Sequence, residues 1–385
     1  MTDLLPSYER WGSLVGKRVL VRVDFNTPVD EVDGLLEVTD DFRIRATLPL
    51  FEDLINRGAT VVACTHFGRP KGEVVEKYSV APVRRRLKEL CPQVELLENL
   101  RFNPGEEKND RAFGEQLVSG FDYYINEAFS ASHREHASIM WPPVLLPSAA
   151  GPNLQKEVTT LSGILQNPAR PFVAIVGGAK VADKLGIVKV LSEKADTVIV
   201  GGGMAFTFQS TQGRTIGGSL FDESFVDECA ALMDGGKILI PQDSIGLAVG
   251  LPFGSKGGSD TPINFGSNIP DGFQGLDIGP NSITDFEKAI SSASTVLWNG
   301  PMGVFEDERF SDGTEAIARC VAKSSAISVI GGGDSVSAIQ MFGLEDQVTF
   351  VSTGGGASLE FVELGDLPGL KHYVKVASKC HQSRS

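Results

Sequence analysis

The chain has 385 residues, of which 42% are hydrophobic and 22% charged, so it is long enough for two globular domains with separate cores. Its formal net charge of -14 argues against nucleic acid or an anionic membrane as the main partner, and a polyanionic substrate would need a local cluster of positive charge. It contains no run of about eighteen apolar residues and no signal-like first segment, which favours a cytoplasmic protein. The scattered cysteines, which form no C-x-x-C pair, are expected to be packed, reduced thiols: Cys64, Cys91, Cys229, Cys320 and Cys380.

In the first half, strands are expected at residues 18–23, 60–64, 96–100 and 123–126. Asp24 and Asn26 follow the first strand, where ligands bind in open α/β sheets, although turn capping is the alternative. A helix should start near residues 39–41 and end at Gly58. Arg43 in its first turn opposes the helix dipole, which indicates a nearby anion or a surface ion pair with Asp40 or Asp41.

Cations recur after the strands of this half. The strand-end loops hold three of the five histidines, and an arginine recurs at equivalent positions. These residues are Arg43, His66, Arg69, Arg101, His133, Arg134 and His136. Because the planar guanidinium group binds carboxylate and phosphate at two points, the pattern predicts a small anionic substrate.

A domain boundary is expected after a helix over residues 153–165, where residues 167–171 contain two prolines. Strands then recur at residues 172–176, 197–200, 237–240, 295–298, 326–330 and 347–351. Helical stretches alternate with these strands, so a doubly wound parallel sheet is predicted. Glycine clusters follow five strands and would let backbone amides approach a ligand, the alternative being that they are only tight turns.

The stretch from residue 172 to 191 predicts a strand, a turn at Gly177 and Gly178, and an amphipathic helix. Lys180 and Lys184 are four residues apart at the expected start of that helix, so they would share a face at its positive end. Such an arrangement suits a phosphate chain, although a solvated lysine pair is the alternative.

The common nucleotide fingerprints are missing, since neither G-x-x-x-x-G-K-[ST] nor G-x-G-x-x-G occurs, which weakens the P-loop and dehydrogenase interpretations. Asp334, beside a glycine turn, could hold Mg²⁺ through bound phosphates. Glu306 is a candidate for binding a ribose hydroxyl, with a surface carboxylate as the alternative.

Twelve blocks, taken in order, make the chain resemble the phosphoglycerate kinase family. They are VRVDFNTP, TDDFRIRATLP, THFGRPKG, LLENLRFNPGEEKND, YYINEAF, HREHAS, PFVAIVGGAKVADK, VIVGGGMAFTF, GLDIGP, WNGPMGVFE, IGGGDS and STGGGASLE. The resemblance implies two doubly wound α/β domains, the first binding 3-phosphoglycerate and the second Mg²⁺ with ADP or ATP. It implies reversible transfer of the acyl phosphate of 1,3-bisphosphoglycerate to ADP, by a monomer without nucleic-acid or membrane partners.

The resemblance also assigns residues. It implies that Arg43 and Lys180 steady the phosphoryl group in flight, as do Gly354 and Gly355. For phosphoglycerate it implies Asp24, Phe25, Asn26, Arg43, His66, Phe67, Gly68, Arg69, Arg101 and Arg134. For the nucleotide it implies Lys184, Gly201, Gly202, Gly203, Gly275, Glu306, Gly331, Gly332, Gly333, Asp334 and Ser335, with Asp334 on the magnesium side.

The implied domains are residues 1–153 for phosphoglycerate, a hinge helix and linker over 154–170, and residues 171–365 for the nucleotide. The tail 366–385 would pack back on the first domain. The sequence departs from the family where residues 91–95 directly bridge two blocks, which implies a first domain shortened by about one strand and one helix. Its Asn126-Glu127 and Ser130 also replace the family's asparagine-aspartate and glycine. A non-catalytic nucleotide-binding relative is therefore the alternative function.

Overall fold

In the computed structural model, residues 5–371 and 373 are described, apart from the side chain of residue 256. The chain divides into two units. The first comprises the residues up to Ser162 together with the described residues from Leu364 onward, and the second runs from Gly163 to Glu363. Helix α7 (Pro152–Gln166) begins in the first unit and ends in the second.

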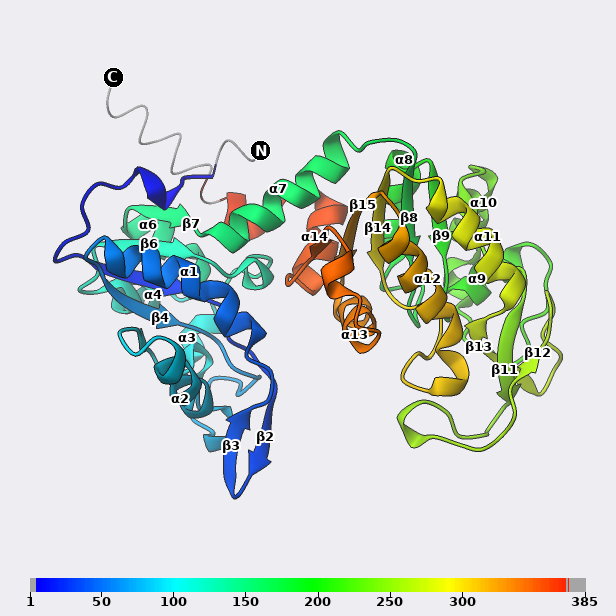
Figure 1. The fold of residues 1–385 in the computed structure, drawn as a ribbon, viewed down its shortest axis with the longest axis horizontal. Coiled ribbons are helices and arrows are strands. Elements are labelled where there is room, and N and C mark those ends of the chain that lie inside the picture. The colour runs from blue at the N-terminus through cyan, green and yellow to red at the C-terminus, as the bar shows by residue number, and fades with distance from the viewer. Residues whose placement is uncertain (1–4, 372, 374–385) are drawn as a thin grey trace. The chain divides into compact units, whose positions relative to one another are not determined.

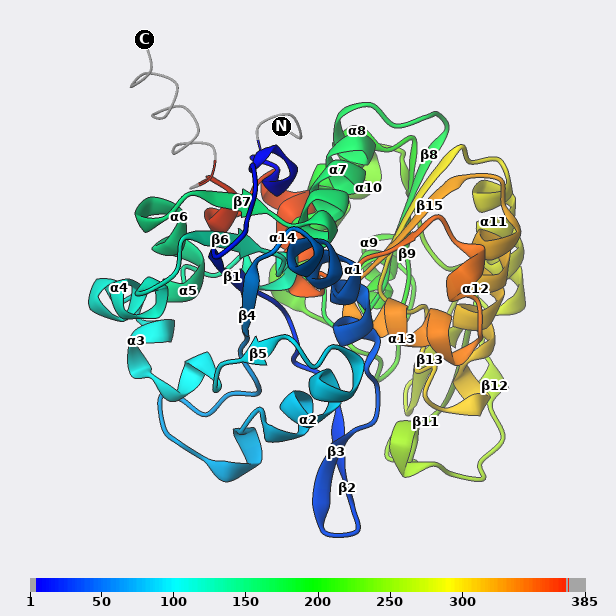
Figure 2. The same ribbon diagram turned by 60° about the vertical axis from the view of Figure 1, so that its left-hand side comes forward.

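The first unit is built on a five-stranded parallel sheet in the order β5-β4-β1-β6-β7 (Figure 2). Its strands are β1 (Arg18–Arg22), β4 (Thr60–Cys64), β5 (Glu95–Leu96), β6 (Tyr123–Asn126) and β7 (Ser148–Ala150). Val19 and Val21 of β1 pack with helices α1 (Phe42–Asn56) and α2 (Ala81–Leu90), whereas Leu20 packs with α4 (Arg111–Val118). Because β1, β4 and β6 run in parallel, their carboxyl ends meet at one edge of the sheet.

Shorter elements complete this unit. They are the hairpin of β2 (Val29–Val32) and β3 (Leu35–Val38), and the helices α3 (Pro104–Glu107), α5 (Ala137–Met140) and α6 (Pro142–Leu145). The described part of the C-terminal segment also packs here. Leu367 and Leu370 are buried, and the Tyr373 hydroxyl donates to the carbonyl of Ala149 at 3.3 Å. Residues 374–385, also assigned to the tail, lie outside the described residues.

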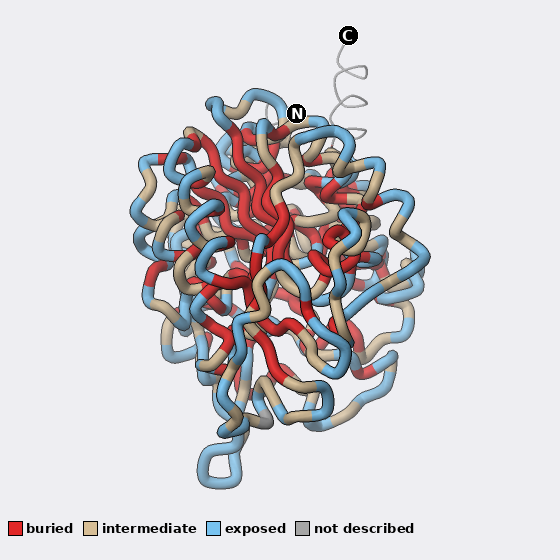
Figure 3. The backbone as a smooth tube through the Cα atoms, turned by 90° about the vertical axis from the view of Figure 1, so that its right-hand side faces the viewer, coloured by how far each residue is buried: buried red, intermediate tan, exposed pale blue. Residues whose placement is uncertain are grey.

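The second unit contains a six-stranded parallel sheet in the order β10-β9-β8-β14-β15-β16. Its central strands β9, β8, β14 and β15 are labelled in Figure 1. Its strands are β8 (Phe172–Val176), β9 (Thr197–Val200), β10 (Ile238–Leu239), β14 (Thr295–Asn299), β15 (Ile327–Gly331) and β16 (Phe350–Val351). An antiparallel sheet adds β11 (Ser244–Ala248), β12 (Ile263–Asn264) and β13 (Phe273–Ile278). Figure 3 shows the buried residues concentrated along central strands.

The helices of the second unit follow its strands along the chain. They are α8 (Leu185–Lys194), α9 (Ala205–Thr211), α10 (Val226–Asp234), α11 (Pro280–Ser291), α12 (Asp312–Lys323), α13 (Gly333–Met341) and α14 (Gly356–Leu364). One large hydrophobic cluster joins α11, α12 and α13 to strands β8, β14 and β15. No helix among the described residues has the length and apolar character that a membrane span needs.

The predicted α/β class with parallel sheets is confirmed, and several element predictions are corrected. The strand expected at residues 96–100 is only β5, because Leu100 already starts a 3-10 turn (Leu100–Phe102). The helix expected from Lys180 begins at Leu185, since Gly178 hydrogen-bonds to Pro301 and Met204 and turns the chain first. The shortened first domain and the hinge remain predictions.

The cysteine expectation holds where the structure describes it. Cys64, Cys91 and Cys229 are buried free thiols, and Cys320 is a partly buried one that packs against the core of the second unit. Cys380 lies outside the described residues.

Candidate functional site

An ion pair joins two of the predicted substrate residues at the edge of the first sheet. Asp24 lies two residues beyond β1, and Arg43 is the second residue of α1. The Arg43 guanidinium pairs with the Asp24 carboxylate, which also accepts a hydrogen bond from Ser130. Burial alone would raise the pKa of Asp24, but the charge of Arg43 outweighs it, helped by His66 once its ring is protonated in acid and by the hydrogen bond from Ser130, and the pKa falls to about 2. The carboxylate is therefore ionised at neutral pH.

The surface partners considered for Arg43 are engaged elsewhere. Asp41 pairs with Arg45 at 2.8 Å and with Arg86 at 2.7 Å, and Asp40 accepts from the first backbone N–H of α1 at 2.8 Å. Arg43, the cation in the first turn of α1, therefore pairs with Asp24 at the sheet edge and not with a surface carboxylate.

The loop after β4 is tied to the same edge. The side chain of Asn26 accepts a hydrogen bond from the backbone N–H of Gly68 at 2.9 Å, and Arg101 donates to the carbonyl of Gly68 at 2.6 Å. Gly68 has a φ of +59°, a conformation that favours glycine. The side chains of Phe25 and Phe67 are buried in the core, so only their backbone is available to a ligand.

Two further arginines lie within electrostatic reach of His66. Arg101 is only 3% exposed, and burial together with the charge of Arg134 lowers its pKa to about 10. Arg134 is partly exposed, and its Nε donates to Nε2 of His133 at 3.1 Å. Arg69 is exposed beside Gly68, and His136 is buried beneath this edge. The predicted residues linked to one another at this edge, by direct contacts or by charge interactions, are Asp24, Asn26, Arg43, His66, Gly68, Arg101 and Arg134.

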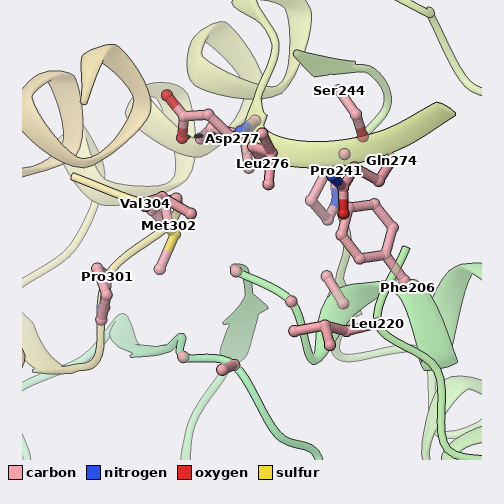
Figure 4. Close-up of a pocket in the computed structure, with 18 of the residues that line it drawn as sticks. Phe206, Leu220, Pro241, Ser244, Gln274, Leu276, Asp277, Pro301, Met302 and Val304 are labelled. Carbon is pink, nitrogen blue, oxygen red and sulfur yellow. Dashed lines mark hydrogen bonds between the residues drawn. The ribbon is translucent and has the colours of Figure 1, made fainter. Parts of the chain in front are cut away.

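The second unit contains a cavity of about 300 Å³ (Figure 4). Apolar side chains line two sides of it: Phe206, Leu220 and Pro241 on one, Met302 and Val304 on the other. Five residues predicted for the nucleotide also line it: Gly202, Gly203, Gly275, Glu306 and Asp334.

Gly275 lets an aromatic ring lie directly against the backbone of β13. A Cβ atom at this position would be 2.4 Å from Cζ of Phe206. The N–H of Gly275 donates to the hydroxyl of Ser219 at 2.9 Å, which fixes the backbone there. Any larger residue would clash with this ring, which forms part of the cavity wall.

Lys184 lies beside the turn that follows β14. It precedes α8, and its ammonium group donates to the side-chain oxygen of Asn299. A Cβ atom on Gly300 would be 3.0 Å from the same nitrogen. Burial lowers the pKa of Lys184 to about 8, although Asp334 and Asp183 act in the opposite direction.

The N-terminus of α13 is open. Gly332 has a φ of +87°, and nothing lies within 4 Å of a Cβ atom built on Gly333. Asp334 is exposed in the first turn, whereas Ser335 is buried and donates to the carbonyl of Gly331 at 2.9 Å. Free backbone N–H groups and the helix dipole make this end suitable for an anion.

Other glycine turns pack against each other. A Cβ atom would lie 2.1 Å from the carbonyl oxygen of Pro301 at Gly177, and 2.4 Å from Sδ of Met302 at Gly201. Close packing between turns therefore explains Gly177 and Gly201 without a ligand. For these two glycines, the alternative that the glycine clusters are only tight turns is sufficient.

Lys180 is exposed in the turn before α8, so the prediction that it shares a helical face with Lys184 is wrong. Gly354 and Gly355 precede α14. The N–H of Gly354 donates to the Ser352 hydroxyl at 3.1 Å, and Gly355 has a φ of +55° with open space around it.

Sequence reasoning missed much of the cavity wall. Phe206, Leu220, Gln274, Met302 and Val304 were not proposed as site residues. An aromatic residue three positions after a triple glycine, as at Phe206, is the one signal that could have drawn attention to it.

Two α/β units, one with arginines at the edge of a parallel sheet and one with a cavity next to an open helix N-terminus, fit the class of two-domain α/β transferases of phosphoryl groups. The family model described as "Phosphoglycerate kinase" matches residues 11–95 and 91–364. The chain belongs to the phosphoglycerate kinase family, whose members transfer a phosphoryl group to a carboxyl group.

Individual relatives agree over nearly the full length. Phosphoglycerate kinase of Rubrobacter xylanophilus is 47% identical, with 93% of this chain and 95% of the relative covered. The enzyme of Moorella thermoacetica is 46% identical, with 93% and 96% covered. The structure of phosphoglycerate kinase from Coxiella burnetii superposes with a TM-score of 0.87 at 35% identity, over 97% of this chain and 100% of that one. This similarity favours the enzyme over the non-catalytic relative considered above.

Proposed function

We propose that the first unit binds 3-phosphoglycerate at the edge where β1 and β4 end. The observation that supports this best is the partly buried Asp24–Arg43 pair, with Arg101, Arg134 and His66 within electrostatic reach. In a chain with a net charge of -14, the arginines of this group suit a ligand that carries a carboxylate and a phosphate. The ionised Asp24 is an acceptor for a substrate hydroxyl.

The individual assignments follow from exposure. Arg69, being exposed, is available to the phosphate, and Asn26 and the backbone of Gly68 would bound the ligand. Phe25 and Phe67 contribute backbone groups only, because their side chains are core residues.

The cavity of the second unit is proposed to hold the nucleoside part of ADP or ATP. A volume of about 300 Å³ with apolar walls suits a nucleobase. Glu306 is exposed at the wall, where it could accept hydrogen bonds from ribose hydroxyls. The phosphates would extend to Lys184 and the open amides from Gly331 to Gly333, with Ser335 bracing that turn.

Asp334 fits a role toward Mg²⁺. Its carboxylate is exposed in the first turn of α13, next to the amides proposed for the phosphates, and lines the cavity. Magnesium prefers few carboxylates together with phosphate oxygens and water. When bound, Mg²⁺ would neutralise charge on the nucleotide phosphates.

Catalysis is proposed to rest on positioned charge. Both acceptors, a carboxylate and the terminal phosphate of ADP, are already anionic, so no strong base is needed. Arg43 and Lys180 would neutralise the phosphoryl group in flight, and the amides of Gly354 and Gly355 would add donors. Transfer requires that the substrates meet with water excluded, so we propose hinge closure of a monomer that works in the cytoplasm.

Calorimetric titration tests the division of substrates. The variant Arg134→Ala should weaken binding of 3-phosphoglycerate by tenfold or more, the loss of one hydrogen bond to a charged group, and leave ADP binding unchanged. Arg111→Ala, which removes an exposed arginine paired with Glu115, is the matched control and should change neither. Unaltered 3-phosphoglycerate affinity in Arg134→Ala would contradict the assignment.

A further inference from the structure

Arg22 is an arginine with no exposed surface at the last position of β1. In the sequence it stands out only as one residue of a predicted strand. Its Nε donates to the hydroxyl of Ser138 at 3.0 Å, and its Nη1 donates to the carbonyl of Val23. Two of its three nitrogens are therefore anchored inside the protein.

The third nitrogen of Arg22 faces a residue proposed for substrate binding. Nη2 lies 3.1 Å from Nδ1 of His66. A guanidinium group has five donors, no acceptor, and a pKa too high for it to lose a proton. Nδ1 must therefore present its lone pair, and a neutral ring carries its only hydrogen on Nε2.

The surroundings of His66 keep its ring neutral. Burial is the largest influence and lowers the pKa to about 3, helped by the charges of Arg22, Arg101 and Arg134 and opposed by Asp24. The residue is partly exposed, and Nε2 has no hydrogen-bond partner among the residues that the structure describes. One N–H donor is thus left open.

We propose that Arg22 is a positioning residue that holds His66 as the Nε2–H tautomer, so that His66 offers one neutral, directed donor to an oxygen of the phosphoglycerate. The proposal rests on the proposed role of His66 in substrate binding. It distinguishes the basic residues of this edge that would contact the substrate from Arg22, which would act only through His66. A neutral donor also keeps its hydrogen bond at any pH well above the pKa of the ring.

Arg22 also has a structural partner, which the experiment must take into account. Ser138 donates from its N–H and its hydroxyl to the fully buried Glu106, at 2.9 and 2.6 Å. Through Ser138, the positive charge of Arg22 faces this carboxylate. Removing the charge is expected to lower stability as well, since it takes away the positive charge that most favours the ionised form of Glu106.

Nitrogen NMR of the full-length protein labelled with ¹⁵N-histidine reads the tautomer directly, with His66 assigned by its loss in His66→Gln. We expect Nδ1 of His66 to be unprotonated and Nε2 protonated from pH 5 to 8. A ring with hydrogen on Nδ1, or one doubly protonated at pH 6, overturns the proposal. This measurement needs no Arg22 variant, so it decides the question even if every such variant fails to fold.

Kinetics test the consequence. In Arg22→Met the KM for 3-phosphoglycerate should rise about tenfold, the effect of one hydrogen bond to a charged group, and should become pH-dependent between pH 5 and 7, whereas kcat should change little. Arg22→Lys, which keeps a donor and a charge, should retain the flat pH profile. Arg18→Met, on the same strand but exposed, is the matched control and should behave as wild type.

A double-mutant cycle distinguishes indirect from direct action. If Arg22 acts through His66, Arg22→Met should add nothing to the KM of His66→Gln. Additive effects in this cycle would overturn the proposal. If the NMR result is as expected but His66→Gln leaves the KM unchanged, the role of His66 in substrate binding fails, whereas the tautomer assignment stands.

Discussion

The two candidate half-sites, at the edge of the first sheet and in the cavity of the second unit, are lined by different kinds of residues. At the edge of the first sheet, charged side chains contact one another, as in the pair of Asp24 with Arg43. The cavity of the second unit is lined mainly by glycine and apolar side chains, and its buried carboxylate, Asp277, accepts hydrogen bonds from the backbone N–H groups of Gly313 and Ile278 at 2.8 and 2.9 Å. The first arrangement suits an anion held by charge, and the second suits a flat ring held by contact.

The two carboxylates show what the difference means physically. Asp277 is buried and Asp24 is largely shielded from solvent, and this desolvation pushes both pKa values upward. Arg43, helped by Ser130 and by protonated His66, reverses this for Asp24 and brings its pKa to about 2, whereas Asp277 has only backbone partners and its pKa rises to about 7. The identity of the neighbours, and not the depth of burial, decides which form is present.

Removing a charge from the first half-site should have the largest effect. We expect Arg43→Ala to lower kcat by about 10²–10³, the loss typical of one preorganised charge at a transition state. Arg45→Ala, two residues along α1 and paired with Asp41 on the surface, should retain wild-type turnover. A coupled assay that finds undiminished turnover in Arg43→Ala would show that charge is not what the first half-site supplies.

The same contrast explains which parts of the site could be read from the sequence. Asp24 and Arg43 interrupt apolar patterns at the end of a strand and the start of a helix, so their positions stand out. Phe206 and Val304 cannot be told from core residues until the cavity is seen. Charge at an element boundary is a visible signal, whereas an apolar wall is not.

The fold divides in a similar way. The buried parallel strand β8 was predicted to the residue, because five consecutive apolar residues are flanked by a proline and glycines. Strands β11 and β13 were missed, since each contains a glycine and only partly alternates in burial. The pairing of Arg22 with His66 was also out of reach, because it depends on the register of β1 against β4.

Changing the shape of the second half-site should have the next largest effect. In Gly275→Ala the new methyl group would meet the Phe206 ring, at 2.4 Å from Cζ in the present geometry, and displace this part of the cavity wall. We expect ADP affinity to fall roughly 30-fold, the middle of the range for overpacking, with 3-phosphoglycerate affinity unchanged. Gly12→Ala, where nothing lies within 4 Å, is the matched control in calorimetry. Equal ADP binding in both variants would remove the aromatic wall from the proposal.

Charge does enter the second half-site at Lys184, and pH should reveal it. The pKa of about 8 means that the ammonium form predominates at pH 7 and is mostly lost at pH 9. If only the charged form binds the phosphates, ADP affinity should fall about tenfold over this range. Lys184→Met should bind weakly and without this slope, whereas Lys189→Met, on the exposed side of α8, should keep it. A wild-type affinity that is flat from pH 7 to 9 would contradict the role of Lys184.

The smallest expected effect tests the comparison of the two carboxylates itself. The folded-state pKa of Asp277, about 7, lies above its ordinary value of 3.8, so the folded protein binds a proton that the unfolded chain has already released. The free energy of unfolding should therefore decrease as pH rises from about 4 through 7. Asp277→Asn cannot titrate, so its stability relative to wild type should increase between pH 5 and 8 in urea unfolding, whatever constant offset the lost acceptor brings. Asp271→Asn, at an exposed position of the same unit, should show no such trend.

For Asp24→Asn the sign reverses, because a lowered pKa stabilises the folded state above the ordinary value and this contribution is lost only as pH falls toward 2. A stability difference between Asp277→Asn and wild type that stays constant from pH 5 to 8 would mean that the pKa of Asp277 is not raised. It would contradict the contrast drawn between this carboxylate and Asp24.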